Sequence, residues 1–146
     1  MKASDVMTPN PACCAPGTSL VDVSQMFVEH DVGAIPVVDP ATGRPIGIVT
    51  DRDVATRAVA SGTDARKLTA GDCMTTSLVT VAPDANLEEV LAAMSENQVR
   101  RLIVVDGGGR VAGIISQADV ALHAKNKESG EMVEEVSKPT EASAGD

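Results

Sequence analysis

An internal repeat is the feature of this chain that most constrains its fold. The segment KASDVMT at 2–8 returns as TAGDCMT at 69–75, an offset of 67 positions. Further along, GIVTDRDVA at 47–55 returns as GIISQADVA at 113–121, and the offset there is 66. A one-residue deletion in a loop between strands explains the change, since loops tolerate deletions. The duplication therefore predicts two similar units that bury their apolar faces against each other.

Each copy predicts the element order β-α-β-β-α. In the first copy, periodicity and turn residues place these elements at 12–15, 19–30, 34–38, 45–50 and from Asp51 onward. The second copy begins with a strand at 79–82 and a helix at 86–97, and it ends with a helix from about Gln117. One unit of about 55 residues is too small to bury much core by itself. We therefore expect an α+β fold in which the two repeats pack as a pseudo-twofold pair.

The repeat also suggests how the chain is divided. The expected parts are repeat 1 at 2–61, a polar linker at 62–68, repeat 2 at 69–125 and a tail at 126–146. The tail carries six acidic residues and two lysines and has little apolar content. Such a composition is typical of a disordered segment, because it cannot bury enough apolar surface to offset the entropy of ordering.

Composition excludes several classes of partner. The chain has 12 Lys and Arg against 21 Asp and Glu, a net charge of −9, which argues against binding to nucleic acid. No apolar run approaches the roughly 18 residues of a membrane helix, and the first residues lack the apolar stretch of a signal peptide. We therefore expect a cytoplasmic protein with no membrane partner. With no Trp, no Tyr and one Phe, its core must be built from aliphatic side chains and Met.

Two Thr/Ser-x-x-Asp motifs occupy equivalent positions, Thr50 to Asp53 and Ser116 to Asp119. Each follows an apolar strand and opens a helix, so each fits a capping box, in which hydroxyl and carboxylate bond the backbone amides of the first turn. The same geometry also suits a ligand. A helix N-terminus accommodates phosphate, and a carboxylate one turn in can accept hydrogen bonds from the vicinal hydroxyls of a ribose. The spacing alone leaves both interpretations open.

The ordered series GAIPVVD…GIVTDRD and VRRLIVVD…GIISQAD resembles the CBS-domain family, in which two repeats form a CBS pair, or Bateman module. The resemblance covers about residues 2–125 and is similar in organisation to small stand-alone bacterial CBS-pair proteins, including the hypoxic response protein type. It implies a homodimeric regulatory module without catalysis of its own. It also implies that AMP, ADP, ATP, NAD or S-adenosylmethionine binds in clefts between the repeats, with AMP as the first candidate. A separate protein that the module regulates is compatible with this interpretation.

The resemblance implies two clefts and an arginine pair between them. The first cleft is expected to be lined by Asp119, Ser116 and Ile114 of repeat 2 and by Thr8, Asn10, Pro11, Ala12, Val32, Gly33, Ala34 and Ile35 of repeat 1. The second is expected to be lined by Asp53, Thr50 and Ile48 of repeat 1 and by Thr75, Val79, Val99 and Leu102 of repeat 2. Arg100 and Arg101 are expected between the clefts, where guanidinium groups suit phosphate. The alternative for these two residues is a solvated position at a strand edge.

Two departures from the family pattern distinguish the clefts. The proline present as Pro36 is replaced by Ile103 in the second copy, which puts the adenine contacts of the Asp53 cleft in doubt. Asp51 adds a negative charge beside that cleft, where the other cleft has Gln117. We therefore expect phosphorylated ligands to prefer the Asp119 cleft.

The remaining candidates point to structure rather than chemistry. His30 and His123 have no partner at nucleophile or metal-ligand spacing, the vicinal Cys13 and Cys14 form no CxxC pattern, and no glycine-rich phosphate loop is present. The sequence therefore predicts no catalytic residue, no metal site and no catalytic cofactor. The competing function is a ligand-free dimeric scaffold whose capping boxes only cap helices. Under either function a homodimer is expected to form through the two final helices, where Val54, Ala55, Ala58 and Val59 are matched by Val120, Ala121 and Ala124.

Overall fold

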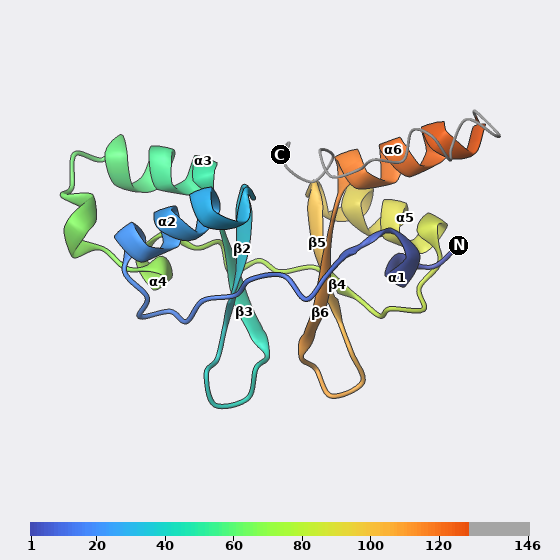
Figure 1. Ribbon diagram of the computed structural model, residues 1–146, viewed down its shortest axis with the longest axis horizontal. Helices are drawn as coiled ribbons and strands as arrows, with labels where there is room; N and C mark the ends of the chain where they lie inside the picture. The colour runs from blue at the N-terminus through green and yellow to red at the C-terminus, as the bar shows by residue number, and fades with distance from the viewer. Residues whose placement is uncertain (129–146) are drawn as a thin grey trace.

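The computed structural model describes residues 1–128 and places two similar units side by side (Figure 1). Each unit has a β-hairpin near the centre of the molecule and helices on its outer side. The predicted α+β pair of β-α-β-β-α repeats is confirmed. The elements of the first half are α1 (Ala3–Val6), β1 (Thr8–Pro9), α2 (Leu20–His30), β2 (Ala34–Val38), β3 (Pro45–Thr50), α3 (Asp51–Asp53), the π-helical turns η1 (Val54–Val59) and the 3-10 turn η2 (Ala65–Lys67). Those of the second half are α4 (Ala70–Cys73), β4 (Thr80–Val81), α5 (Leu87–Asn97), β5 (Arg101–Val105), β6 (Val111–Ser116) and α6 (Gln117–Glu128).

Local sequence signals fix the ends of the two long amphipathic helices. The Ser19 hydroxyl caps α2 by accepting from the Asp22 amide at 3.0 Å, and Asn86 with Glu89 forms a reciprocal capping box on α5. Each helix ends at a residue in the left-handed conformation, Asp31 (φ 54°) or Gln98 (φ 55°). The chain then turns directly into the inner strand of a hairpin, so the helix and strand of each unit pack together.

The strands form two sheets, one of order β1-β6-β5-β4 and a two-stranded β2-β3 hairpin. The strand expected at 12–15 is reduced to one bridge, Cys14 with Val37, because Pro11 and Pro16 on either side cannot donate backbone hydrogen bonds. A strand that was not predicted, β1, instead pairs antiparallel with β6 of the other repeat.

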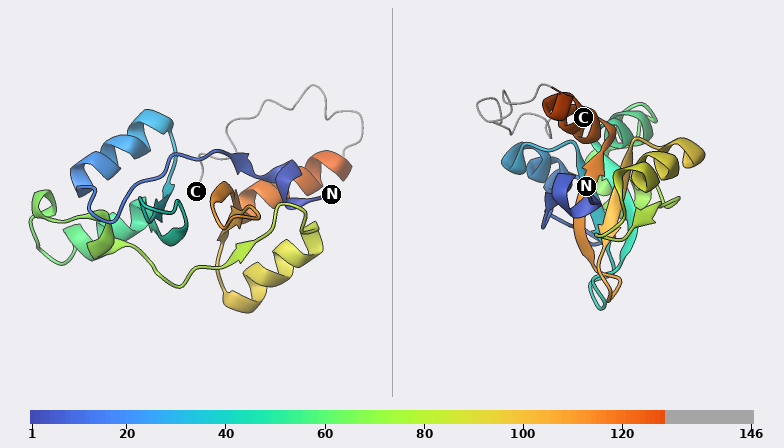
Figure 2. Two further views of the ribbon diagram at one scale, coloured as in Figure 1. Left: turned by 90° about the horizontal axis from the view of Figure 1, so that it is seen from below. Right: turned by 90° about the vertical axis from the view of Figure 1, so that its right-hand side faces the viewer.

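The start of each repeat packs on the core of the other repeat. Ala3 is fully buried among the apolar residues of the second half, and its amide donates to the Ala85 carbonyl at 2.7 Å. In the same way, Ala70 and Cys73 are buried in the core of the first half. Figure 2 shows the chain running from α1, beside α6, across to α2 in the other unit. The two units are therefore joined by exchanged segments.

Some residues of the predicted dimer face are buried in the core, and the others are exposed at the surface. Val54 packs on the core, and Ala58 and Val120 are buried, so these three side chains serve their own units. Ala55 and Val59 are exposed, as are Ala121 and Ala124. In η1, Val54 and Ala58 therefore face the core, whereas Ala55 and Val59 face the surface.

Of the segment predicted as a tail, residues 126–128 continue α6, and the remainder lies outside the described residues. Within the described range, no helix is long and apolar enough to cross a membrane.

Candidate functional site

A cleft of about 200 Å³ lies between the start of the chain, the junction of α2 with β2, and the β6–α6 junction. Strand β1 brings Thr8 opposite Ile114 on β6, so residues from both repeats face each other across this space. Its lining includes ten predicted residues, namely Thr8, Asn10, Pro11, Ala12, Val32, Gly33, Ala34, Ile114, Ser116 and Asp119, together with Arg101, Pro9 and His30. Most of the residues that the family resemblance implied for this cleft therefore lie around one space.

A second cleft, of about 190 Å³, has the same relation to the other carboxylate. It brings together the predicted Ile48, Thr50, Asp53, Thr75, Val79, Val99, Arg100 and Arg101, and it adds Ser77, Leu78 and Ile103. The bridge between Ile48 and Thr75 holds the two repeats together on this side, as β1 and β6 do on the other. Each cleft is thus a product of the exchanged segments.

Two predicted residues do not line either cleft. Ile35 and Leu102 are 0% and 1% exposed and belong to the apolar cores of their units. Successive side chains on a strand point to opposite faces, so Leu102 faces the core where Arg101 and Ile103 face the cleft. The expectation that Ile35 and Leu102 line the clefts was therefore wrong. Their strand neighbours Ala34 and Arg101 line the clefts instead.

The sequence contained a signal for some of the missed residues. Ser77 and Leu78 lie 67 positions after Asn10 and Pro11, so the repeat itself maps them onto residues that were predicted for the first cleft. His30 had no such signal. It ends α2 and borders the Asp119 cleft only because the helix packs against the hairpin, whereas its repeat equivalent Asn97 bonds back to the Ala93 carbonyl at 2.8 Å.

Both Thr/Ser-x-x-Asp motifs form complete capping boxes. The Asp119 amide donates to the Ser116 hydroxyl, the Ser116 amide donates to Asp119 Oδ2, and both distances are 3.0 Å. Thr50 and Asp53 make the same two bonds at the same distance. A carboxylate has about four lone-pair sites, so one capping bond leaves it able to accept further hydrogen bonds. The capping and binding interpretations of these motifs are therefore compatible.

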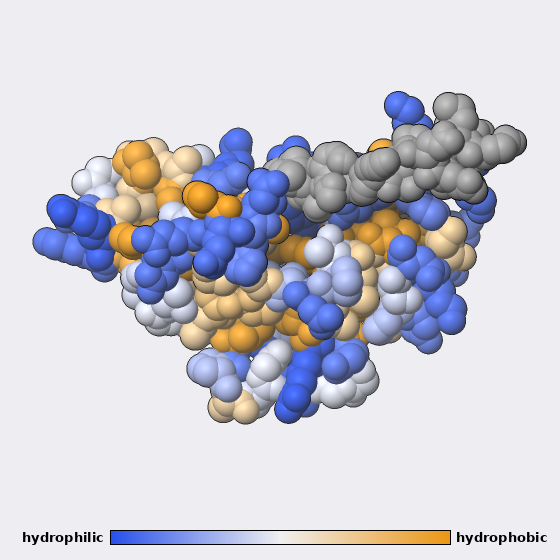
Figure 3. Space-filling model, viewed as in Figure 1, coloured by the Kyte–Doolittle hydropathy of each residue, from blue (hydrophilic) through white to orange (hydrophobic). Residues whose placement is uncertain are grey.

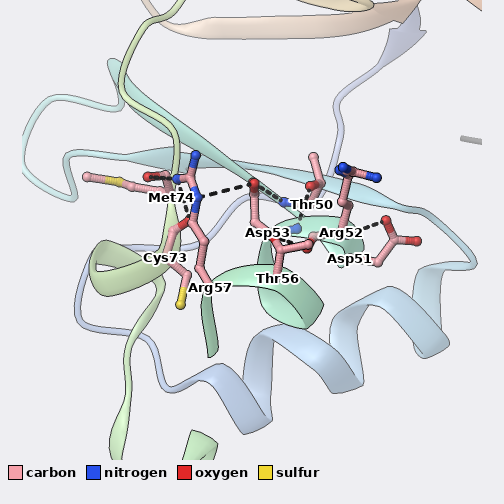
Figure 4. A network of polar contacts seen from close by, with 8 residues as sticks. All are labelled: Thr50, Asp51, Arg52, Asp53, Thr56, Arg57, Cys73 and Met74. Carbon is pink, nitrogen blue, oxygen red and sulfur yellow. Dashed lines mark hydrogen bonds and ion pairs between the residues drawn. The ribbon is translucent and has the colours of Figure 1, made fainter. Parts of the chain in front are cut away.

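A cation lies beside Asp53. Figure 4 shows Arg57 next to this carboxylate, with Nε 3.9 Å from Asp53 Oδ1. The Arg57 guanidinium also donates to the carbonyls of Cys73 and Met74 at 3.1 and 3.0 Å, which ties η1 to the end of α4. The equivalent residue in the other repeat is His123, whose buried Nε2 has no hydrogen-bond partner within residues 1–128. The two carboxylates therefore differ in their surroundings although their caps are the same.

The third feature is a cavity of about 420 Å³ at the N-terminus of α6. It is lined by Arg100, Arg101, Ser116, Gln117, Ala118 and Ala121. Arg101 pairs with Ser116 across β5 and β6, and the Gln117 amide donates to the Arg100 carbonyl at 2.8 Å. The arginine backbone is thus held in place at the junction of this cavity with the clefts.

The cysteine side chains offer no activated nucleophile. Burial raises the pKa of the Cys13 thiol, and burial together with the neighbouring Cys13 raises the pKa of Cys14 to about 11. Burial, followed by the nearby carboxylate of Asp72, also raises the pKa of Cys73. These thiols are protonated at neutral pH, and the thiolate is the nucleophilic form. No group of three or more His, Cys, Asp or Glu residues suited to a metal occurs in the part of the chain that the structure describes.

Comparison with known proteins places these features in context. The sequence pattern of the CBS domain matches residues 3–60 and 70–125. Hypoxic response protein 1 of Mycobacterium tuberculosis is 36% identical over 121 residues, which is 83% of each chain. The crystal structure of CBSX2 in complex with AMP superposes with a TM-score of 0.71 at 29% identity, covering 85% of this chain and 96% of the other. The CBS domain pair of protein MJ0100, in complex with 5′-methylthioadenosine and S-adenosyl-L-methionine, gives a TM-score of 0.77 at 26% identity, covering 87% and 98%.

Proposed function

Because this chain belongs to the CBS domain family, we propose that it is a regulatory module that binds adenosine-containing ligands in the clefts between its two repeats and has no catalysis of its own. AMP is the first candidate ligand. The observation that carries the proposal is the geometry of the Asp119 cleft. There Asp119, the start of α6 and Arg101 border one space that is otherwise lined mainly by apolar residues, with Thr8, Asn10 and His30 as further polar members. The AMP complex of CBSX2 and the two adenosine-containing ligands of the MJ0100 pair support this ligand class.

Each part of an adenine nucleotide has a suitable counterpart in this cleft. The aliphatic side chains of Val32, Ala34 and Ile114 offer apolar contact to the adenine ring. The Asp119 carboxylate can accept from the ribose hydroxyls while it continues to cap α6. The Arg101 guanidinium and the N-terminus of α6 suit the phosphate. The described residues of this cleft thereby provide a counterpart for the adenine, the ribose and the phosphate.

The Asp119 cleft is the better candidate for a phosphorylated ligand. Asp53 has Arg57 beside it, and that guanidinium competes with ligand hydroxyls for the carboxylate. Asp51, at the start of α3, adds an exposed negative charge where α6 has Gln117. Ile103 lines the Asp53 cleft at the position equivalent to Pro36, so the two inner strands also differ. We therefore expect tighter binding at Asp119 than at Asp53.

A dimeric scaffold is the second candidate function. The observation that favours it is that both capping boxes are complete without a ligand, so helix capping by itself accounts for the two motifs. Under this interpretation the clefts would bind no nucleotide, and the exposed apolar side chains on the helices would serve association.

Thermal melting of the purified protein with and without nucleotide distinguishes the two functions. Ligand at 100 times its dissociation constant stabilises the native state by about 2.7 kcal/mol, which corresponds to about 5–10 °C for a domain of this size. Asp119→Ala should abolish the shift with AMP, Asp53→Ala should weaken it less, and Asp119→Asn should retain the fold but lose affinity. If AMP, ADP, ATP, NAD and S-adenosylmethionine at millimolar concentration all leave the wild-type melt unchanged, the sensor function is rejected in favour of the scaffold.

Glu89→Ala is the matched control. Glu89 completes the capping box of α5 with Asn86, in the same way that Asp119 completes that of α6, but it lines neither cleft. Loss of either cap should lower the melting temperature of the ligand-free protein, since a cap contributes about 1 kcal/mol. Only Asp119→Ala should also remove the ligand-dependent shift. An equal loss of that shift in Glu89→Ala would assign the effect to general destabilisation.

A further inference from the structure

One residue borders three of the cavities formed by the described residues where the two repeats meet. Arg101 lines the Asp119 cleft, the Asp53 cleft and the cavity at the N-terminus of α6, and Arg100 lines the last two. Arg101 is the first residue of β5, and its pairing with Ser116 places it at the end of the hairpin nearest to α6. The two clefts therefore meet at Arg101.

Permanent positive charge at this junction is scarce. Among the described residues that line the three cavities, Arg100 and Arg101 are the only lysines or arginines, and the facing acids are Asp53 and Asp119. His30 is the one further titratable group on the Asp119 cleft, and it lies 3.5 Å from the carboxylate of Glu29. The whole chain carries a net charge of −9. Apart from Arg57, which is engaged by Asp53 and by two backbone carbonyls, this arginine pair is the permanent positive charge that the described residues bring to phosphate in either cleft.

We propose that the two clefts are negatively coupled for phosphorylated ligands because they share Arg101. This inference rests on the proposed function, namely adenosine-ligand binding in both clefts. The first phosphate to bind engages the Arg101 guanidinium and compensates its charge. A second phosphate then meets a partner that is already engaged, with an anion on the other side of the seam. Since coupling is reciprocal, the penalty is the same whichever cleft fills first.

The expected penalty is about tenfold in the affinity of the second step, within the usual range of coupling between two sites. A ligand without phosphate, such as adenosine, places no anion at the junction, and its two binding steps should be independent. Raising the salt concentration should reduce the penalty for AMP, because mobile ions screen charges across a solvent-accessible cavity.

Isothermal titration calorimetry of the full chain with AMP and with adenosine tests the coupling. Two variants isolate the clefts. Ala12→Trp fills the Asp119 cleft, and Ser77→Trp fills the Asp53 cleft, and each site lines only one of the two. Each variant gives the association constant of the cleft that stays open. The product of these two constants, divided by the product of the two stepwise wild-type constants, is the coupling factor.

We expect a coupling factor of about ten for AMP and about one for adenosine, with the AMP factor falling toward one at high salt and in Arg101→Gln. A factor of one for AMP overturns the inference. An equal factor for AMP and adenosine also overturns it, since the coupling would then run through packing rather than charge. Absence of binding of either ligand to the wild-type protein instead overturns the proposed function, and the inference with it. The two failures are therefore distinguished by whether adenosine and AMP bind at all.

Discussion

Replacing Gly113 by alanine tests how closely the exchanged segments must approach. Gly113 lies on β6 opposite Pro9 of β1, the strand that crosses from the other repeat. A Cβ atom at this position would lie 2.3 Å from Met7 Sδ, 2.8 Å from Met7 Cγ and 3.0 Å from the Thr8 carbonyl oxygen. Carbon contacts are optimal at about 3.5–4.0 Å, so the Met7 sulfur would have to move by more than about 1 Å. An alanine methyl group therefore fits only if Met7 or β1 moves.

The cost follows from the two ways in which the clash can be relieved. Met7 can leave the apolar cluster of the second half, or β1 can move away from β6 and weaken its pairing. Overpacking of this kind costs about 1–3 kcal/mol. Alanine also lowers the conformational entropy of the unfolded chain, and this offsets about 0.4–1 kcal/mol of the overpacking cost. The net loss of about 1–2 kcal/mol should lower the melting temperature by about 3–8 °C.

Circular dichroism melts of three variants measure this effect. Gly47→Ala should behave like Gly113→Ala, because its Cβ would lie 2.5 Å from Met74 Sδ in the equivalent contact of the other repeat. Gly17→Ala is the control, since a Cβ there has no neighbour within 4 Å. The argument is refuted if Gly113→Ala melts within about 1 °C of Gly17→Ala, a difference that corresponds to well under 1 kcal/mol.

Three further predictions concern association, the end of the chain and the thiols. Figure 3 shows apolar atoms at the surface over the helices of the first half, where Val59 is 64% exposed. Light scattering should show a homodimer at micromolar concentration, and Val59→Lys should shift it toward monomer; a monomeric wild type contradicts this. Truncation after Glu128 should change the melting temperature by less than about 2 °C, given the composition of the removed segment. Because the pKa of Cys14 is raised to about 11, its stabilising contribution is complete below about pH 9, where unfolded thiols begin to ionise, and is lost as pH rises through 11. Alkaline denaturation followed by circular dichroism should show this loss, and Cys14→Ala should lessen it.

Local sequence determined most of the elements, and the family resemblance indicated most of the residues that line the two clefts. The caps at Ser19 and Asn86 fixed where the long helices begin, because capping depends on atoms within one turn. The two Thr/Ser-x-x-Asp motifs likewise predicted their own hydrogen bonds, which depend only on spacing. The duplicated order of elements implied the pair of units, since neither copy could bury a core alone. The limits of the two repeats, the dimer and the cytoplasmic location stay predictions.

Tertiary structure decided which repeat each segment packs on. Nothing local distinguishes a Thr8–Pro9 strand on β6 from one on its own hairpin, because the choice depends on contacts with residues about 100 positions away. The same holds for His30, which borders a cleft only through the packing of α2, and for Arg101, which meets three cavities because two hairpins lie side by side. Strand alternation, fixed by register, turned Leu102 into the core and Arg101 toward the clefts. Sequence spacing sets contacts within a turn or a strand, whereas the clefts arise where distant segments meet, and only the folded chain brings those together.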